Sequence, residues 1–178
     1  MAMLSDIALV AQVAVAGNKR AFDTLVGRYQ SPVRRFFLNQ TLGDSQLSDE
    51  LAQDTFIKAY THIGGFRGQS AFQTWLMRIA YNVWYDYTRS HRETVDIDHV
   101  QQRTASASPV VKMDMYSALN ILRAEERTCV TLQLIDGYDI AKIAAITGMK
   151  EGTVKSHLSR GKEKLANYLR QNGYDGKR

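Results

Sequence analysis

Apolar residues recur every three or four positions along most of the chain, the spacing that gathers them on one side of an α-helix. No segment shows the strict alternation of apolar and polar residues that marks a half-buried β-strand. The pattern predicts an all-α protein, with helices over about 4–16, 22–37, 48–62, 71–90 and 116–136 and two more within 139–165.

Residues with special backbone or capping preferences indicate where several helices begin or bend. Ile7 and Val15 are among the apolar positions that define the first helix. Ser48 and Ser70 stand just before helical patterns, where a hydroxyl can cap the first free N–H groups. Pro32 lies inside the second pattern, so it either begins a new helix or kinks the existing one.

The helical pattern breaks down between His91 and Asp114. The segment TASASP, followed by Pro109, is small and polar, which is typical of a linker. A connection of about 20 residues is longer than those within a compact domain. We therefore expect two small helical domains, residues 1–92 and 114–178, joined by a flexible linker at residues 93–113.

Composition excludes several classes of protein. Only 2 of the 178 residues are proline and 12 are glycine, which argues against a disordered or all-β chain. The single Cys129 excludes an internal disulfide and a zinc site of several cysteines, and its apolar helical surroundings favour a buried thiol over a nucleophile. The four histidines lack the spacing of metal ligands, so no metal or other cofactor is expected.

The N-terminal stretch MAMLSDIALVAQVAVAG is apolar, but it begins without lysine or arginine, and Asp6 and Gln12 interrupt it. It therefore has neither the charged start of a signal peptide nor the length of a membrane-spanning helix. A cytoplasmic protein is the resulting expectation.

Positive charge is concentrated in two blocks of the chain. Overall, 23 Lys+Arg against 18 Asp+Glu give a net charge of +5. Residues 139–178 carry nine basic and four acidic residues, and residues 66–92 carry four basic and one acidic. Residues 93–138, between the blocks, carry four basic and seven acidic residues. Two separated basic blocks suggest two contacts with a polyanion such as nucleic acid.

Residues 139–165, DIAKIAAITGMKEGTVKSHLSRGKEKL, have the pattern of a helix-turn-helix that ends in a basic helix. Ala144 allows two helices to approach, Gly148 permits the left-handed turn between them, and Val154 anchors the second helix. The second helix also carries residues suited to phosphates and base edges in a major groove: Thr153, Lys155, Ser156, Ser159, Arg160 and Lys162. The alternative is a helical hairpin with a solvated basic face.

A second candidate surface lies on the helix predicted over 71–90. Its members fall at positions i, i+3, i+4, i+7, i+8 and i+11: Arg78, Tyr81, Asn82, Tyr85, Asp86 and Arg89. Bases stack on aromatic rings, arginine holds phosphate and an amide reads a base edge, a combination that suits single-stranded nucleic acid. The spacing equally allows Tyr81 and Tyr85 to pack against a neighbouring helix.

The helix predicted over 48–62 has an acidic side, on which Glu50 and Asp54 are one turn apart with Gln53 beside them. Two carboxylates can divide the acid and base roles of catalysis, but no nucleophile or metal-ligating histidine accompanies this pair. The residues favour the other interpretation, which is docking to a basic surface of a partner protein.

In this order and spacing, the segments resemble the extracytoplasmic-function (ECF) sigma factors of bacterial RNA polymerase, over nearly the whole chain except the linker. The family's first conserved region resembles DIALVAQVAVAGNKRAFDTLVGRY, and its polymerase-binding segment resembles DELAQDTFIKAY. Its promoter-melting and minus-ten segment resembles FRGQSAFQTWLMRIAYNVWYDYTR. Its helix-turn-helix for the minus-thirty-five element resembles LIDGYDIAKIAAITGMKEGTVKSHLSRGKEKL.

The resemblance implies roles for individual residues. Contacts with the coiled coil of the large polymerase subunit are implied for Glu50, Gln53, Asp54 and Phe56. Asn82 aligns with a position near the flipped minus-ten base, and we expect its neighbours to hold the same strand: Arg78, Tyr81, Tyr85 and Arg89. Groove-facing positions are implied for Lys155, Ser156, Ser159 and Arg160. The family often has proline where this chain has Arg123.

The resemblance implies a promoter-specificity subunit that directs core RNA polymerase to promoter DNA, with no enzymatic activity, cofactor or small-molecule substrate. The first domain would bind polymerase and the melted minus-ten strand, and the second would read duplex DNA about three helical turns upstream. An anti-sigma factor is implied as a further partner.

Two alternatives belong to other classes of function. One is a transcription activator or repressor with the same helix-turn-helix and a helical sensor or dimerisation domain. The other is a DNA-processing enzyme, for which the sequence offers neither an acidic metal cluster nor a nucleophile with a base.

Overall fold

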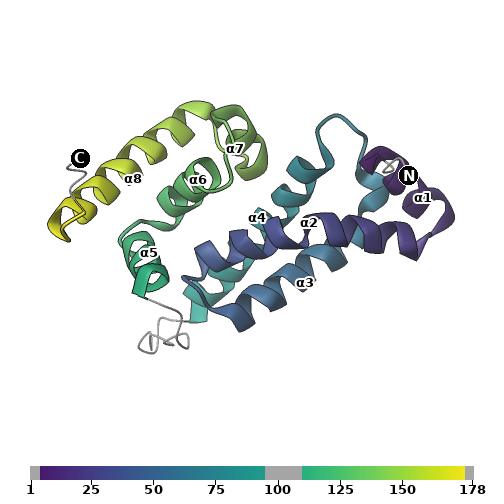
Figure 1. Cartoon of the computed structure of the whole chain (residues 1–178). Helices are drawn as coiled ribbons and strands as arrows, with labels where there is room; N and C mark the ends of the chain where they lie inside the picture. The colour runs from purple at the N-terminus through teal and green to yellow at the C-terminus, as the bar shows by residue number, and fades with distance from the viewer. Residues whose placement is uncertain (1–4, 95–109, 175–178) are drawn as a thin grey trace. The chain divides into compact units, whose positions relative to one another are not determined.

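The computed structural model describes residues 5–94 and 110–174 and divides the chain into two compact units (Figure 1). The first unit comprises Met1–Phe37 and Leu47–Val100, and the second comprises Leu38–Gln46 and Gln101–Arg178. Every regular element within the described residues is a helix, which confirms the all-α prediction.

The helices up to residue 94 are α1 (Asp6–Ala16), α2 (Lys19–Gln40), α3 (Ser45–Thr61), the short 3₁₀-helix η1 (Ile63–Gly65) and α4 (Phe72–Thr94). Those after residue 109 are α5 (Val110–Asn120), α6 (Ala124–Leu134), α7 (Ile140–Thr147) and α8 (Glu151–Gln171). The predicted linker begins within α4 and ends within α5, and its residues 95–109 lie outside the described ones. Across the described ranges, no helix combines the length and the apolar character needed to cross a membrane.

The core of the first unit forms between α2, α3 and α4. Buried apolar side chains come from all three helices: Leu25, Val33, Phe36, Leu51, Ala59, Leu76, Met77 and Ala80. Phe72 adds an aromatic cluster, because its ring lies 5.4 Å from Tyr29, 5.5 Å from Phe66 and 5.5 Å from Trp75. Burying one such side chain contributes roughly 1.5–3 kcal/mol, so this packing determines which side of α4 faces inward.

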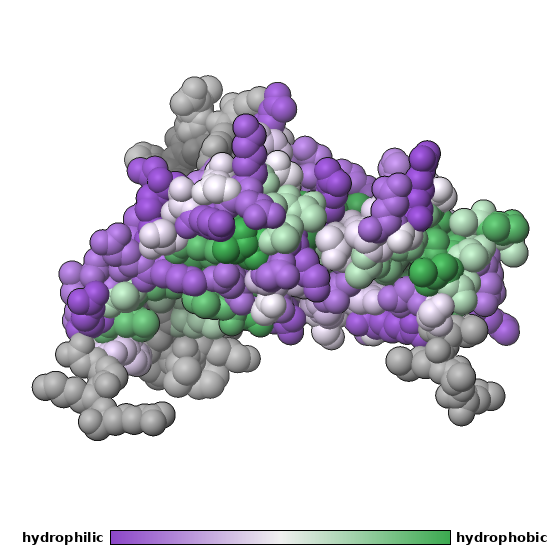
Figure 2. Space-filling view, turned by 90° about the horizontal axis from the view of Figure 1, so that it is seen from above, coloured by the Kyte–Doolittle hydropathy of each residue, from purple (hydrophilic) through white to green (hydrophobic). Residues whose placement is uncertain are grey.

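Helix α1 forms as predicted, but the inward side differs from the expected one. Ile7 and Val15 are 65% and 89% exposed, and the buried residues are instead Leu9, Val10 and Val13. Figure 2 shows apolar surface, in green, at the right-hand end, where Figure 1 draws α1.

The orientation of α1 follows from a polar residue. Asp6 accepts a hydrogen bond from Arg28 of α2 at 2.7 Å and another from the Tyr29 hydroxyl. Asp6 lies one turn before Leu9 and Val10, on the same side of the helix. Because α1 is apolar nearly all round, this pairing with α2 can decide which side is buried.

Three further sequence predictions concern the ends of helices. Helix α2 runs through Pro32, so the proline does not begin a new helix. Ser48 is buried inside α3, which begins one turn earlier, at Ser45, so the predicted cap is wrong. Ser70 is also not a cap, because its hydroxyl donates to the carbonyl oxygen of Ala71 and does not accept from a helix N–H.

The second unit packs α8 against α5, α6 and α7 (Figure 1). Its buried apolar residues are contributed by all four helices and by the turn after α5: Leu119, Leu122, Val130, Leu132, Ile143, Ile146, Val154 and Leu158. Cys129 is fully buried, as predicted. Burial, and to a smaller degree the nearby charge of Glu125, raises the pKa of the Cys129 thiol to about 12.

The helix predicted over 116–136 is in fact two helices. Arg123 is extended, with φ −62° and ψ 157°, and it separates α5 from α6. Its N–H donates to Glu126 Oε2 at 3.1 Å, which caps the start of α6. The Arg127 guanidinium donates to the carbonyl oxygens of Leu119 (3.0 Å) and Leu122 (3.2 Å), near the end of α5. Side chains of α6 thus form hydrogen bonds with backbone N–H and C=O groups that have no helical partner at the break between α5 and α6.

The helix-turn-helix forms at the predicted positions, as α7 and the first half of α8. The Asp139 side chain caps α7 by accepting from the Lys142 N–H at 2.8 Å. Gly148 ends α7 with φ +74°, in the left-handed region that favours glycine. Val154 is fully buried on the inner side of α8, as its spacing predicted.

Candidate nucleic-acid interface

One side of α4 faces solvent between Arg78 and Arg89. Arg78, Asn82, Asp86 and Arg89 are exposed, and Tyr85 is 54% exposed. This arrangement follows from the sequence, because the apolar residues on the opposite side of α4 form the core of the unit. Packing of Tyr85 against a neighbouring helix, the second interpretation of the spacing, is therefore not what the structure shows.

Tyr81 occupies an intermediate position on the same helix. It is half-buried, and its ring centroid lies 6.4 Å from that of Tyr85 at an angle of 35° between the planes. Trp84, at the edge of this face, is buried and stacks on Tyr87. The exposed aromatic surface of α4 is therefore centred on Tyr85.

A shallow hollow of about 760 Å³ adjoins the α4 face, a size within the ~300–1,000 Å³ of small-molecule pockets. It is lined by the end of α3, by η1 and by α4: Lys58, Thr61, His62, Gly64, Gly65, Trp75, Arg78, Ile79, Asn82 and Asp86. Its walls combine apolar surface from Trp75 and Ile79 with an amide from Asn82. Lys58 and Asp86 form an ion pair of 3.6 Å among these residues.

Sequence reasoning found only part of this hollow. It placed Arg78 and Asn82 on one face of a helix, but it did not connect this face with Gly64 or Gly65. In the structure these glycines line the hollow, where neither places a side chain. The sequence could not predict the hollow, because it forms only when α3, η1 and α4 pack together in the tertiary structure.

The acidic side of α3 is also accessible. Glu50, Gln53 and Asp54 are exposed, and Phe56 is half-buried. Ile57 and Tyr60 on the same helix are 62% and 37% exposed. Periodicity alone does not single out these two residues, and they add apolar area to α3. In residues 5–94 and 110–174, no group of three or more histidine, cysteine or acidic side chains is arranged to hold a metal ion.

The predicted groove-facing residues of α8 all lie on its exposed side: Thr153, Lys155, Ser156, Ser159, Arg160 and Lys162. The buried side consists of Val154, Leu158 and Gly161, which are four and three residues apart. A Cβ atom on Gly161 would lie 2.6 Å from Val130 Cγ2, so the absent side chain brings α8 close to α6. The predicted face of α8 is thus presented outward by tight packing on its other side.

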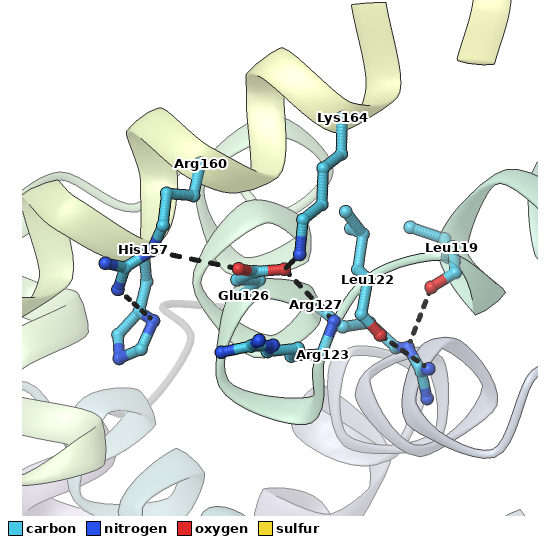
Figure 3. Close-up of polar contacts among 8 residues, drawn as sticks. All are labelled: Leu119, Leu122, Arg123, Glu126, Arg127, His157, Arg160 and Lys164. Carbon is cyan, nitrogen blue, oxygen red and sulfur yellow. Dashed lines mark hydrogen bonds and ion pairs between the residues drawn. The ribbon is translucent and has the colours of Figure 1, made fainter. Parts of the chain in front are cut away.

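A carboxylate that sequence reasoning missed lies beneath this helix. Glu126 of α6 is 1% exposed and accepts a hydrogen bond from Lys164 Nζ of α8 at 2.7 Å (Figure 3). Arg160 Nε lies 3.8 Å from Glu126 Oε1, and the Arg160 guanidinium also donates to His157 Nδ1 at 3.3 Å. One residue of the candidate DNA-reading face is therefore paired with a buried acid.

Glu126 is held in its charged form. Burial raises the pKa of its carboxyl group, but the hydrogen bonds from Lys164 and from the Arg123 N–H, with the charges of both residues, more than offset burial. The pKa of Glu126 therefore lies below its ordinary range, and the group is a carboxylate at neutral pH.

Comparisons with known protein families match both parts of the chain. The family model of sigma-70 region 2 matches residues 25–94, and that of sigma-70 region 4 matches residues 112–165. The ECF RNA polymerase sigma factor SigM of Mycobacterium tuberculosis is 34% identical over 93% of this chain and 85% of its own length. RNA polymerase sigma-H factor of Pseudomonas aeruginosa is 32% identical over 84% of this chain and 86% of its own length.

Two solved structures share the fold. One is CnrH in complex with the cytosolic domain of CnrY, with a TM-score of 0.74 and 26% identity, covering 95% of this chain and 99% of the other. The second is the sigma factor RpoE in complex with the anti-sigma factor NepR from Bartonella quintana, with a TM-score of 0.70 and 28% identity. That match covers 84% of this chain and 96% of the other.

Proposed function

Because the chain belongs to the ECF sigma factors of bacterial RNA polymerase, we propose that its two units recognise two parts of one promoter. The chain directs core polymerase to specific promoters and initiates transcription, which is the function that defines the family. The assignment of particular residues to these steps is our proposal, and it is supported by their exposure and grouping. The activator or repressor alternative is set aside, since both matched family models are regions of sigma factors.

The N-terminal unit captures the unpaired minus-ten strand. The observation that carries this assignment is the exposed α4 face, which adjoins a hollow at Arg78 and Asn82. A flipped base fits the hollow, where Trp75 and Ile79 offer apolar walls and Asn82 offers an amide for a base edge. Tyr85 is placed to stack on a neighbouring base, a contact of about 1–3 kcal/mol. Arg78 and Arg89 hold the phosphates of the strand, with half-buried Tyr81 in support.

The C-terminal unit reads the duplex at the minus-thirty-five element. The exposed side of α8 enters the major groove with Lys155, Ser156, Ser159 and Arg160 toward the bases. Thr153 and Lys162 lie on the flanks of this set and contact phosphates. The short polar side chains permit a close approach, and Arg160 supplies the paired donors that suit a guanine.

Core polymerase docks on α3. Its exposed acids, Glu50 and Asp54, with Gln53, meet a basic surface of the large subunit, and Phe56 supports them from a half-buried position. Exposed Ile57 supplies apolar area beside these charges. Charge complementarity of this kind favours rapid and specific encounter. An anti-sigma factor is a further partner, as in the solved relative bound to NepR.

The chain has no enzymatic activity of its own in this proposal, and it acts in the cytoplasm. It uses binding energy to place polymerase, and the phosphodiester chemistry belongs to the polymerase. Its ligands are promoter DNA and protein, with no cofactor and no small-molecule substrate.

Strand capture is tested with Asn82→Ala and Tyr85→Ala in reconstituted holoenzyme. Asn82→Ala should relax the preference at one minus-ten position, because it removes the amide that reads a base. Tyr85→Ala should slow open-complex formation, measured by permanganate footprinting and abortive initiation. Tyr85→Phe is the matched control, because it keeps the stacking ring and should open promoters like the parent.

A template already opened across the minus-ten region should partly rescue Tyr85→Ala, because unpairing then costs nothing. Binding to the upstream duplex should be unchanged in both variants. Strand capture by this face is refuted if both alanine variants melt duplex promoters and choose start sites like the parent.

A further inference from the structure

Two basic residues of α8 share one buried carboxylate. Glu126 Oε2 accepts from Lys164 Nζ at 2.7 Å, and Oε1 lies 3.8 Å from Arg160 Nε (Figure 3). Lys164 and Arg160 are four residues apart, so both lie along one edge of α8, where its exposed side borders α6. Oε2 also accepts from the backbone N–H of Arg123 at 3.1 Å. The Glu126 carboxylate is therefore held at the start of α6 by a backbone hydrogen bond that does not depend on α8.

Close packing at Gly161 makes this sharing possible. A Cβ atom there would lie 3.5 Å from Glu126 Cβ and 2.6 Å from Val130 Cγ2. Gly161 lies between Arg160 and Lys164 in the sequence, so α8 packs closely on α6 beside the residue that carries the shared carboxylate. A larger residue would separate the helices and withdraw both cations from the acid.

We propose that Glu126 is a positioning residue for promoter reading, which aims Arg160 at a base and keeps Lys164 away from the phosphates. This inference rests on the proposed role of α8 in reading duplex DNA. Arg160 Nε faces Glu126, and one of its terminal nitrogens donates to His157 Nδ1 at 3.3 Å. Two neighbours on different sides restrict the plane of the guanidinium while further N–H groups remain for DNA.

The physical advantage lies in pre-organisation. A free arginine loses rotamer freedom when it binds a base, and this loss weakens recognition. A guanidinium already oriented by a carboxylate loses less, and its donors approach the guanine O6 and N7 in a fixed geometry. Lys164, held by the same acid, contributes little to sequence-independent attraction. Both effects favour specificity over general affinity for DNA.

Glu126 also stabilises the unit, so its role must be separated from a merely structural ion pair. Glu126→Gln keeps the size of the side chain and an oxygen that accepts from the Arg123 N–H, but it removes the charge. Lys164→Gln is the matched control, because it breaks the 2.7 Å pair while Glu126 and Arg160 remain. A purely structural role predicts similar behaviour for the two variants.

The experiment uses the full chain bound to core polymerase and a duplex promoter library randomised over the upstream element. Bound DNA is sequenced to give the preference at each base position, and binding to the selected promoter is measured against salt. Glu126→Gln should lower the preference at one position at least about fivefold, with the other positions unchanged. Its salt slope should steepen by about 0.9, because Lys164 becomes free to contact one phosphate.

Lys164→Gln should keep the parent's base preferences. In an Arg160→Ala background, Glu126→Gln should change the preference no further, since the acid acts through Arg160. Glu126→Asp, which withdraws the charge by one methylene, should repeat the loss if Glu126→Gln does not fold. Thermal unfolding of each variant identifies those that are folded.

Two results would overturn the proposal differently. If Glu126→Gln keeps the parent's preferences while Arg160→Ala loses one, Glu126 is only a structural partner. If the parent itself selects no upstream sequence, the proposed reading role of α8 fails, and the positioning role fails with it.

Discussion

Replacing Gly161 by alanine should loosen the second unit, although alanine is the better helix former. The new Cβ would lie 2.6 Å from Val130 Cγ2, about 1 Å closer than the ~3.5–4.0 Å at which carbon atoms pack. Overpacking of a core costs about 1–3 kcal/mol, and glycine to alanine in a helix returns about 1 kcal/mol. The expected net loss is therefore about 1 kcal/mol, or about a fivefold increase in the open population.

Cys129 provides the assay, because it is the single cysteine of the chain and is fully buried beside Val130. Burial and the charge of Glu125 raise the pKa of its thiol to about 12, so a thiol reagent at pH 8 reacts after the unit opens. Gly161→Ala should increase the labelling rate about fivefold. Both tryptophans, Trp75 and Trp84, lie in α4 of the other unit, so tryptophan fluorescence should follow the parent.

A second background makes the test sharper. Val130→Ala removes the Cγ2 atom that the new Cβ would meet, so in this background Gly161→Ala should keep only its helix-forming gain and slow the labelling. Gly152→Ala in the first turn of α8 has nothing within 4 Å of its new Cβ and should not speed labelling. An equal effect of Gly161→Ala in both backgrounds would refute the steric reasoning.

Three further predictions concern charge. Arg160→Ala should cost about 1–3 kcal/mol and relax one base position if Arg160 reads a guanine, or reduce the salt slope by about 0.9 if it contacts phosphate; unchanged promoter selection and salt dependence would contradict both. Asp54→Arg, alone or with Glu50→Arg, should sharply weaken core polymerase binding in a pull-down while helicity persists, whereas Asp23→Arg on α2 should not. The lowered pKa of Glu126 means that its stabilising effect is complete above its unfolded pKa and is lost as pH falls through the folded pKa; acid titrations of unfolding should show Glu126→Gln losing this step.

The helix-turn-helix was predictable because its signals are local. Asp139 caps α7 through a residue three positions away, and Gly148 ends the same helix four residues after Ala144. Val154 then faces inward on α8. Each signal involves residues that are neighbours in the sequence, so no knowledge of the packing was needed.

Predictions that depended on distant partners were less complete. The side of α1 that is buried is linked to a pair between Asp6 and Arg28, 22 residues apart. Periodicity could not choose that side, since α1 is apolar nearly all round. The hollow beside Asn82 likewise needs three elements in place, and Gly64-Gly65 carried no sign of it in the sequence. The exposure of Tyr85 on α4 was also undecided, because the spacing equally allowed its ring to pack against a neighbouring helix.

The role of Glu126 was not predicted, because it depends both on a signal from neighbouring residues and on a distant partner. Its position three residues after the N-cap is that of the acid in a capping box, but the cap residue is arginine and not serine or threonine. Its partner Lys164 is 38 residues further along the chain. The local signal was incomplete and the distant one was invisible without the packing of α6 on α8.

The departure at Arg123 bears on this same carboxylate. The family often has proline here, and Arg123 has φ −62°, the value that a proline ring imposes. The backbone at the start of α6 therefore suits either residue. The difference is the N–H, which in this chain donates to Glu126 Oε2 and which a proline lacks. In this chain Glu126 Oε2 accepts from the Arg123 N–H and from Lys164 Nζ. With proline at position 123 the first of these hydrogen bonds would be lost, and the carboxylate would be less firmly anchored to α6. Replacing arginine by proline at position 123 would thus affect the orientation of Arg160 through the Glu126 side chain, without any change in the path of the backbone.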